Sequence, residues 1–319
     1  MDIQRWMARR DPQWRELDNL LKQAESQGIR SLRSPEVRQL SSLYRSVSAD
    51  LARAQTHQVG QVVTRHLQDL VTRSFAQIYQ GSRRQEWAAV WQFYAWGLPK
   101  VLRQTSPYWG LAVLLFGLGM GIGWQNSQAD PQFMALLVPE GIIEQVRDRG
   151  ELWTGSIVGV EPLASSRITT NNLAVCFAAV AGGITAGLYT VFIMVLNGLL
   201  IGCIAVLVAQ YQLAGSFWAF VFPHGSLELP AIFLAGGAGL LLARALLFPG
   251  WYRRLDALRL YGGLAVRLLA AVVPLLLLAG AIEGFISPQP GIPDVLKYGL
   301  GSLLFGLLIS YGCRQPKRG

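Results

Sequence analysis

Charged residues are scarce in this sequence. Asp, Glu, Lys and Arg make up 15% of its 319 residues, whereas about a quarter of an ordinary soluble domain is charged. None of the four occurs between Arg167 and Glu228, a run of 60 residues. A soluble helix has no reason to stay uncharged over such a length, because its outer face would meet water. The scarcity of charge excludes an ordinary soluble protein and predicts an integral membrane protein.

Cysteine and histidine are also few, and the enzyme motifs that use them are missing. The three cysteines (Cys176, Cys203 and Cys313) form no CxxC pair and no cluster with histidine, so the sequence indicates neither a disulfide framework nor a zinc site. The chain also lacks the His-Glu-x-x-His motif, the serine nucleophile elbow and the Walker loop that binds phosphates. We therefore expect no enzymatic activity, no cofactor and no metal.

Positive charge is in excess and is unevenly distributed. The formal net charge is +9, and residues 1–106 hold 16 Lys and Arg against 9 Asp and Glu. The C-terminal tail, residues 314–319, adds three more basic residues. No nucleic-acid recognition motif accompanies this charge, and basic residues beside membrane spans are the usual result of topology selection and of contact with lipid headgroups. We expect contact with membrane lipid and none with nucleic acid.

Residues 1–82 carry the helical pattern of a soluble bundle. In two stretches apolar residues recur on one face at helical spacing. Asp11-Pro12 and Ser34-Pro35 are each typical of an N-cap followed by proline in the first helical position. We predict a cytoplasmic bundle of two antiparallel helices and a shorter helix over 12–27. Its thin core favours packing onto the membrane region or a cytoplasmic partner.

Residues 83–106 are rich in tryptophan. Trp87, Val90 and Trp91 fall on one face of a helix, and arginine and lysine flank them. Indole rings favour the water boundary of a bilayer, and cations favour lipid phosphates, so this segment is predicted to be an amphipathic interfacial helix. The alternative is that the stripe is a buried face of the N-terminal bundle.

The region 107–313 is predicted to be an all-α domain with about six transmembrane helices. Each stretch is near the roughly 20 residues needed to cross the hydrocarbon. The first apolar run starts only after residue 106, so no cleavable signal peptide is expected. An acidic loop, residues 126–170, follows the first span, and a tight turn near Tyr189-Thr190 joins the next two. The predicted spans are Pro107–Gln125, Asn172–Leu188, Phe192–Tyr211, Leu229–Phe248, Tyr261–Ile282 and Asp294–Gly312.

The charge of the short loops predicts the orientation. The loop 251–260 contains three arginines, and with six spans it falls on the same side as the N-terminal region and the basic tail. The positive-inside rule assigns that side to the cytoplasm. We therefore expect a multi-pass protein of the cytoplasmic (inner) membrane with both termini in the cytoplasm and the acidic loop outside.

Glycines recur four residues apart within the predicted spans, as in Gly183/Gly187 and Gly198/Gly202. Such pairs let helix backbones approach closely, which matters in lipid because no hydrophobic force drives helices together there. The same spacing relates Gly117 to Gly121 and Gly119 to Gly123. Close packing within one subunit is favoured over a dedicated dimer seam, and a homo-oligomer remains open.

A few polar residues fall inside the spans, where they are costly. His224 and Glu228 lie four residues apart at the expected start of the fourth span, and Glu283 ends the fifth. They form either a cluster that binds a cation, moves a proton or anchors a polar partner, or helix-end groups that satisfy free backbone atoms. Nearby proline and glycine favour a bent or re-entrant start. Asn197 is expected to hydrogen-bond between helices, and Asn171-Asn172 to cap the second span.

These polar and glycine motifs carry a resemblance to a known family. Over roughly residues 105–315 the chain resembles the stage II sporulation protein M family, with the spans in the expected order. The residues that carry the likeness are Phe222-Pro223-His224-Gly225 with Glu228 and Ala231, Asn197-Gly198 with Gly202, and Glu283-Gly284-Phe285-Ile286-Ser287-Pro288. About 100 residues of N-terminal helices lie outside the family's compact pattern.

The resemblance implies a non-enzymatic scaffold in the membrane. The family's namesake joins two peptidoglycan-cleaving partners, an amidase-type and a lytic-transglycosylase-type enzyme, so wall hydrolases and other envelope proteins are the partners it implies here. The second hypothesis is a transporter or channel for a cation or a small polar solute, lined by His224, Glu228 and Glu283. An intramembrane enzyme, which would need His224 and Glu228 beside a water-accessible cavity, is the third.

Overall fold

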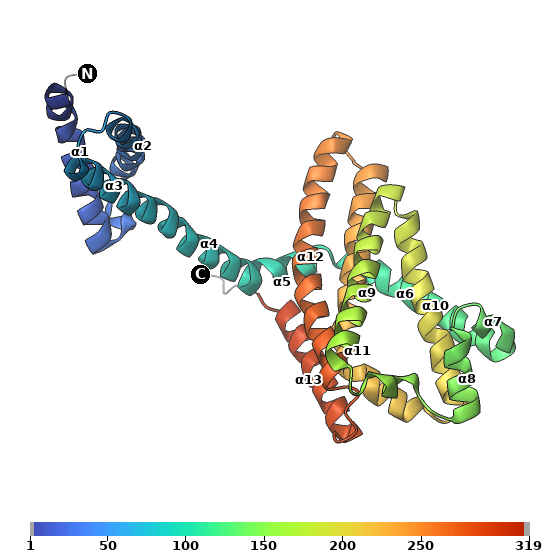
Figure 1. Cartoon of the computed structure of the whole chain (residues 1–319). Helices are drawn as coiled ribbons and strands as arrows, with labels where there is room; N and C mark the ends of the chain where they lie inside the picture. The colour runs from blue at the N-terminus through green and yellow to red at the C-terminus, as the bar shows by residue number, and fades with distance from the viewer. Residues whose placement is uncertain (1–2, 316–319) are drawn as a thin grey trace. The chain divides into compact units, whose positions relative to one another are not determined.

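The computed structural model describes residues 3–315 and is almost entirely helical (Figure 1). No strand occurs among the described residues, and six helices are long and apolar enough to cross a membrane. Both findings confirm the predicted all-α membrane fold. The chain divides into two compact units, Met1–Phe93 and Tyr94–Gly319. The sequence placed the first boundary at residue 82, whereas the structure keeps the following helix with the N-terminal unit.

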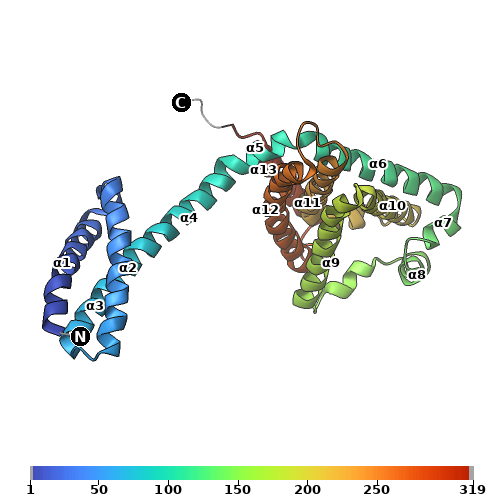
Figure 2. The same ribbon diagram turned by 90° about the horizontal axis from the view of Figure 1, so that it is seen from above.

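The N-terminal unit is a bundle of three antiparallel helices, α1, α2 and α3, which lie side by side in Figure 2. A fourth helix, α4, follows α3 after one π-helical turn. The helices are α1 (Ile3–Gln27), α2 (Ser34–Thr56), α3 (Gln61–Phe75) and α4 (Gly81–Gln92), with a 3-10 turn at Ile29–Ser31 and π-helical turns at Ala76–Gln80 and Phe93–Gly97. The core is a cluster of buried leucines and valines, which includes Leu17, Leu21, Leu40, Val47, Leu67 and Leu70.

Helix α1 begins at Ile3, eight residues before Asp11, so the predicted N-cap at Asp11-Pro12 was wrong. Proline removes one backbone N–H, and the helix tolerates this loss because packing on either side holds it. Trp6 and Trp14 make an edge-to-face contact across Pro12, with ring centroids 5.6 Å apart. The predicted helix start at Ser34-Pro35 is confirmed to within one residue: α2 begins at Ser34, so Arg33 rather than Ser34 is the N-cap.

An arginine clamp ties the end of α3 to α1. Arg73 Nε and Nη2 donate to the two carboxylate oxygens of Glu25 at 2.9 Å each, and Nη1 donates to Asp18 Oδ1 at 2.8 Å. Hydrogen bonds from Lys22 and Arg73 lower the pKa of Asp18 from its ordinary value of 3.8, and Arg73 lowers the pKa of Glu25 from 4.5. The clamp therefore stabilises the bundle while both carboxylates are ionised.

The second unit contains the six spans. They are α6 (Ser106–Ala129), α9 (Glu161–Ala181, continued by a 3-10 turn to Thr185), α10 (Leu188–Gln210), α11 (Ala214–Leu247), α12 (Arg254–Phe285) and α13 (Asp294–Gly312). A short helix, α5 (Leu98–Gln104), precedes them, so the predicted interfacial segment 83–106 is divided between the two units. Trp87 and Trp91 on α4 are exposed.

The predicted acidic loop 126–170 is mostly helical. It contains α7 (Pro131–Ala135), α8 (Glu140–Arg149) and a 3-10 turn at Trp153–Ile157. Ile143 and Val146 of α8 pack with Val206 and Leu207 near the end of α10. Burial of these apolar side chains explains why the segment that the sequence predicted to be an acidic loop is folded rather than extended.

Two predicted boundaries in the first half of the bundle were wrong. The second span begins at Glu161 rather than at Asn172, so Asn171 and Asn172 lie inside α9 and cap nothing. The turn between α9 and α10 comes before Tyr189-Thr190. Its left-handed residues are Ala186 and Gly187, at φ 55° and 86°. A glycine adopts this conformation without strain, which explains why the chain reverses there.

The fourth span is a single helix of 34 residues that begins at Ala214, well before the predicted start at Leu229. Pro223 and Pro230 both lie inside it. Each proline removes a backbone hydrogen bond and bends a helix, and Figure 1 shows the first part of α11 at an angle to the remainder. His224 and Glu228 are consequently in the interior of the helix, not at its end.

Helices α6 and α10 meet through glycines on both sides. A Cβ added to Gly198 or Gly202 of α10 would lie 2.0 or 2.3 Å from a carbonyl oxygen of α6, and Gly119 and Gly123 of α6 face α10 carbonyls in the same way. Gly183 and Gly187 instead face α11, at Gly239 and Ala243. A Cβ on Gly117 or Gly121 would meet nothing within 4 Å. The four-residue spacing therefore marks a helix contact in three of the four pairs.

Leucine at Gly198 or Gly202 is expected to lower the unfolding free energy of the spanning unit by about 1–3 kcal/mol, because α6 would have to move away from α10. Gly117→Leu and Gly121→Leu are matched controls that place the same side chain on the open face of α6. Thermal unfolding of the full chain in detergent measures the difference. Equal midpoints for the two pairs would contradict the contact.

The arginine clamp predicts a pH dependence of the N-terminal unit. The folded pKa values of Asp18 and Glu25 are depressed, so their contribution is complete above about pH 5 and is lost as the pH falls through about 4 and below. We expect Arg73→Met to cost on the order of 1 kcal/mol at pH 7, because the pairs are partly exposed, and much less at pH 3. Hydrogen exchange of α1 and α3 in the full chain, corrected for intrinsic rates, measures both values. The same loss at both pH values would refute the clamp.

Candidate functional site

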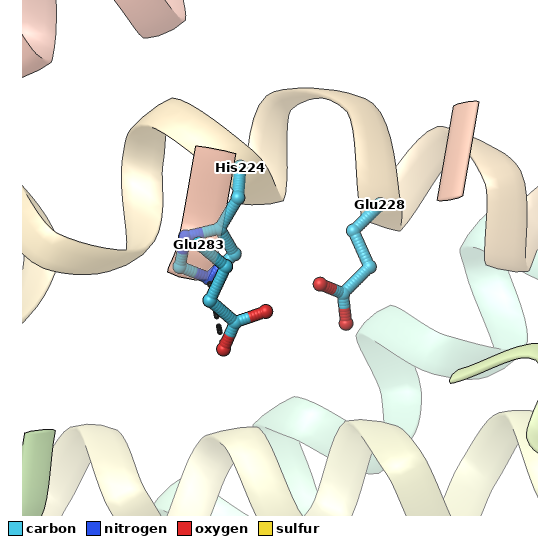
Figure 3. Close-up of side chains that lie close together, drawn as sticks. All are labelled: His224, Glu228 and Glu283. Carbon is cyan, nitrogen blue, oxygen red and sulfur yellow. Dashed lines mark ion pairs between the residues drawn. The ribbon is translucent and has the colours of Figure 1, made fainter. Parts of the chain in front are cut away.

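Three ionisable side chains from two spans point into the same space (Figure 3). His224 and Glu228 lie one turn apart on α11, and Glu283 lies near the end of α12. One nitrogen or oxygen atom from each lies within 4.8 Å of the others. The i, i+4 spacing predicted that His224 and Glu228 share a face. The packing of α11 along α12 brings Glu283 to that face.

His224 is 4% exposed and is held on two sides. Its Nδ1 is 3.0 Å from Ser287 Oγ, in the turn that follows α12. The ring of Phe220, one turn earlier on α11, makes an edge-to-face contact with the imidazole at 5.3 Å between centroids. Because Nδ1 is engaged by Ser287, Nε2 is the nitrogen that faces Glu283.

The Glu283 carboxylate is close to His224 but is not hydrogen-bonded to it. His224 Nε2 and Glu283 Oε1 are 3.8 Å apart, which is longer than a hydrogen bond. The other oxygen, Oε2, is buried and has no hydrogen-bond partner among residues 3–315. A buried carboxylate oxygen without a partner is energetically costly, so it marks this position as one that needs a further interaction.

Helix α9 packs against the turns of α12 that carry Glu283. Glycines at 280 and 284 flank the glutamate and let the α9 backbone approach, and Ser165 Oγ donates to Gly280 O at 2.7 Å. A Cβ at Gly284 would lie 2.5 Å from the Ser165 Cβ. The Glu283 segment therefore has little freedom to move away from α9.

Lys297, on the first turns of α13, is a part of the site that the sequence analysis missed. It is 8% exposed, and its Nζ donates to the carbonyl oxygen of Ser287 at 2.8 Å. Ser287 thus links the lysine, through its backbone, to His224, through its hydroxyl. A lysine inside an apolar span was the available signal, since such a cation is rare unless it has a buried partner.

Asn197 behaves differently from the prediction. Its side-chain amide donates to Ile193 O, one turn earlier in α10, at 2.8 Å, whereas a bond between helices was expected. Asn197 lies beside Gly198, at the contact with α6. Its polar group is therefore satisfied within its own helix.

The site offers one imidazole and two carboxylates inside the spanning bundle. Such a set can bind a cation, exchange a proton or accept hydrogen bonds from a polar partner. The other two histidines, His57 and His66, belong to the N-terminal unit. His224 is accordingly the only histidine in the sequence of the spanning unit.

Profiles of two known families match separate parts of the chain. The profile of a domain of unknown function (DUF8413) matches residues 4–80, which cover α1 to α3. Neither the curated proteins nor the solved structures include a match to the chain. The profile described as Stage II sporulation protein M matches residues 112–288, more than half of the chain, and this range contains His224, Glu228, Glu283 and Ser287. The chain therefore belongs to the Stage II sporulation protein M family.

Proposed function

We propose that this protein is a non-enzymatic membrane scaffold. Its six spans would anchor it in the cytoplasmic membrane, and its N-terminal unit would hold a cytoplasmic partner. The observation that carries this proposal is that the chain combines the spanning bundle with a helical unit that has a core of its own. A unit that buries leucine and valine among its own helices needs no bilayer to fold.

The N-terminal unit also presents a surface of mixed apolar and charged residues that suits a partner, with Asp11 and Arg15 beside the apolar side chains. A hollow of about 410 Å³ lies between α1 and α3 and is lined by Met7, Trp14, Val63 and His66. Val62, at its edge, is 84% exposed. An exposed aliphatic side chain beside a hollow is a feature of protein-binding surfaces, and here we assign it to the proposed cytoplasmic partner.

Envelope proteins are the partners that we propose on the other side of the membrane. We propose that wall hydrolases or related peptidoglycan-remodelling proteins contact the α7–α8 region, which would face outward. Lipid is the remaining contact, because many apolar side chains on α6 and α13 are exposed, among them Leu114, Leu118 and Leu303. A second copy of the chain is a further candidate for these faces.

Transport of a cation or small polar solute is the second candidate function. The convergence of His224, Glu228 and Glu283 inside the bundle supports it. The crevice of about 730 Å³ between α6, α11 and α13 gives it no support, because its lining is mainly apolar and includes none of the three residues. The scaffold therefore remains the first proposal.

Co-purification of the tagged full chain at native expression tests the scaffold. We expect a second protein in stoichiometric amount after gentle solubilisation, lost in Val62→Asp because a charge would be buried at the contact. Gln68→Asp, an exposed site on the same helix, is the control. Recovery of the chain only with itself, together with flux through reconstituted vesicles that Glu228→Gln abolishes, would replace the scaffold by a transporter.

Labelling of introduced cysteines tests the proposed orientation. In a chain that carries Cys313→Ser, Arg253→Cys should react with an impermeant maleimide only after the membrane is opened, because the arginine-rich loop would be cytoplasmic. Glu151→Cys, beyond α8, should react in intact cells with permeable outer layers. Reversed labelling would place both termini outside the cell.

A further inference from the structure

The His224 site contains polar atoms that the described residues leave without partners. Glu283 Oε2 is buried and unpaired, and the 3.8 Å between His224 Nε2 and Glu283 Oε1 is too long for a hydrogen bond. Glu228 points toward the same space from one turn further along α11 (Figure 3). The atoms therefore converge on one position. A small ligand there that donates hydrogen bonds to these atoms, or is coordinated by them, would satisfy them.

The charges of the site select a cation. Among the described residues, neither Glu228 nor Glu283 forms an ion pair with lysine or arginine. The nearby buried cation, Lys297, gives a hydrogen bond to the Ser287 carbonyl instead. Two ionised carboxylates in a region of low dielectric are strongly unfavourable, and one doubly charged cation between them would balance both charges.

The imidazole is arranged as a metal ligand. Ligating histidines characteristically use one ring nitrogen for the metal and the other for a hydrogen bond that fixes the ring. Ser287 Oγ holds Nδ1 at 3.0 Å, and Nε2 is directed at Glu283. Ser287 is itself held in place through the bond from Lys297 to its carbonyl oxygen.

The spacing and the donor types indicate a transition metal. Around Zn²⁺, nitrogen and oxygen ligands at about 2.1 Å lie roughly 3.4 Å from one another. The three donor atoms lie within 4.8 Å of one another, so binding of the ion would require the two glutamate side chains to rotate toward the imidazole. Mg²⁺ and Ca²⁺ prefer oxygen ligands alone, whereas an imidazole with two carboxylates suits Zn²⁺.

We propose that His224, Glu228 and Glu283 bind one divalent transition-metal ion, with Zn²⁺ the preferred ion, and that Ser287 positions the imidazole for it. The site would tie α11 to α12 within the membrane. The sequence offered cation binding as one interpretation of these residues but did not indicate zinc, because the ligands come from two helices and follow no zinc spacing. The inference is independent of the scaffold proposal and requires no movement of the ion across the membrane.

Metal content of the purified full chain tests the proposal. The protein should carry a tag without histidine, be stripped with a chelator and be titrated with Zn²⁺ and, separately, with Co²⁺. We expect one equivalent of either ion per chain, a Co²⁺ absorption spectrum typical of nitrogen and oxygen ligands, and a rise in the thermal midpoint with Zn²⁺ but not with Mg²⁺.

Matched variants locate the ion. Glu228→Gln, Glu283→Gln and His224→Gln should each lose the equivalent of metal, whereas Glu144→Gln and His66→Gln should keep it. The glutamine variants at 228 and 283 remove a buried charge, so the metal-free midpoint is expected to be unchanged or higher, which separates loss of binding from failure to fold. Ser287→Ala should weaken binding about 10- to 100-fold while leaving the stoichiometry intact.

Absence of stoichiometric Zn²⁺ and Co²⁺ binding by the wild-type chain would overturn the proposal. Equal binding by the wild type and all three ligand variants would also overturn it, because the ion would then lie elsewhere. Binding that is lost in these variants, with co-purification of the partner unchanged, would support the metal site and leave the scaffold as a separate result.

Discussion

The contact between α6 and α10 is the constraint on which the spanning bundle depends. Lipid is as apolar as the helix surface, so no hydrophobic free energy is gained when two helices associate in a membrane. Close backbone approach, with its dispersion and weak Cα–H···O contacts, stabilises the pair instead. Gly119 and Gly123 meet carbonyls of α10, while Gly198 and Gly202 meet carbonyls of α6. This reciprocal arrangement fixes both the separation of the two helices and their register.

Helix α11 is packed by the same means and is the span most enclosed by its neighbours. Gly236 and Gly237 pack closely against Ala112 and Trp109 of α6, and Gly239 packs against the backbone of α9. A helix surrounded by protein can carry polar groups that lipid would not accommodate. The enclosure of α11 therefore makes it possible for His224 and Glu228 to lie within a membrane-spanning helix, with Glu283 supplied by α12.

The two units have different physical origins. The N-terminal unit is a soluble type of bundle, with leucine in its core and the Arg73 clamp on its surface. The spanning unit exposes many leucine and phenylalanine side chains and buries polar residues such as Ser226, His224 and Lys297. Separate family profiles match the two parts. The chain thus joins a membrane-spanning bundle to a helical unit that has a core of its own.

Composition and spacing alone determined the fold class, the number of spans and the helical nature of the N-terminal unit, because apolar length and helical periodicity are local properties of the chain. They also showed that His224 and Glu228 share a face, since four residues make about one helical turn.

Sequence patterns gave the wrong helix boundaries where packing between distant segments sets them. Pro223 suited a helix start and Pro230 a bent or re-entrant entry, yet α11 continues through both prolines because its neighbours hold it. Asn172 resembled a cap, yet α9 begins at Glu161. Only the tertiary structure decided the hydrogen bonds that link Lys297 to Ser287 and Ser287 to His224. It also decided that Glu283 Oε2 is buried without a partner among the described residues. These features arise where α11, α12 and α13 meet, which a local pattern does not reveal.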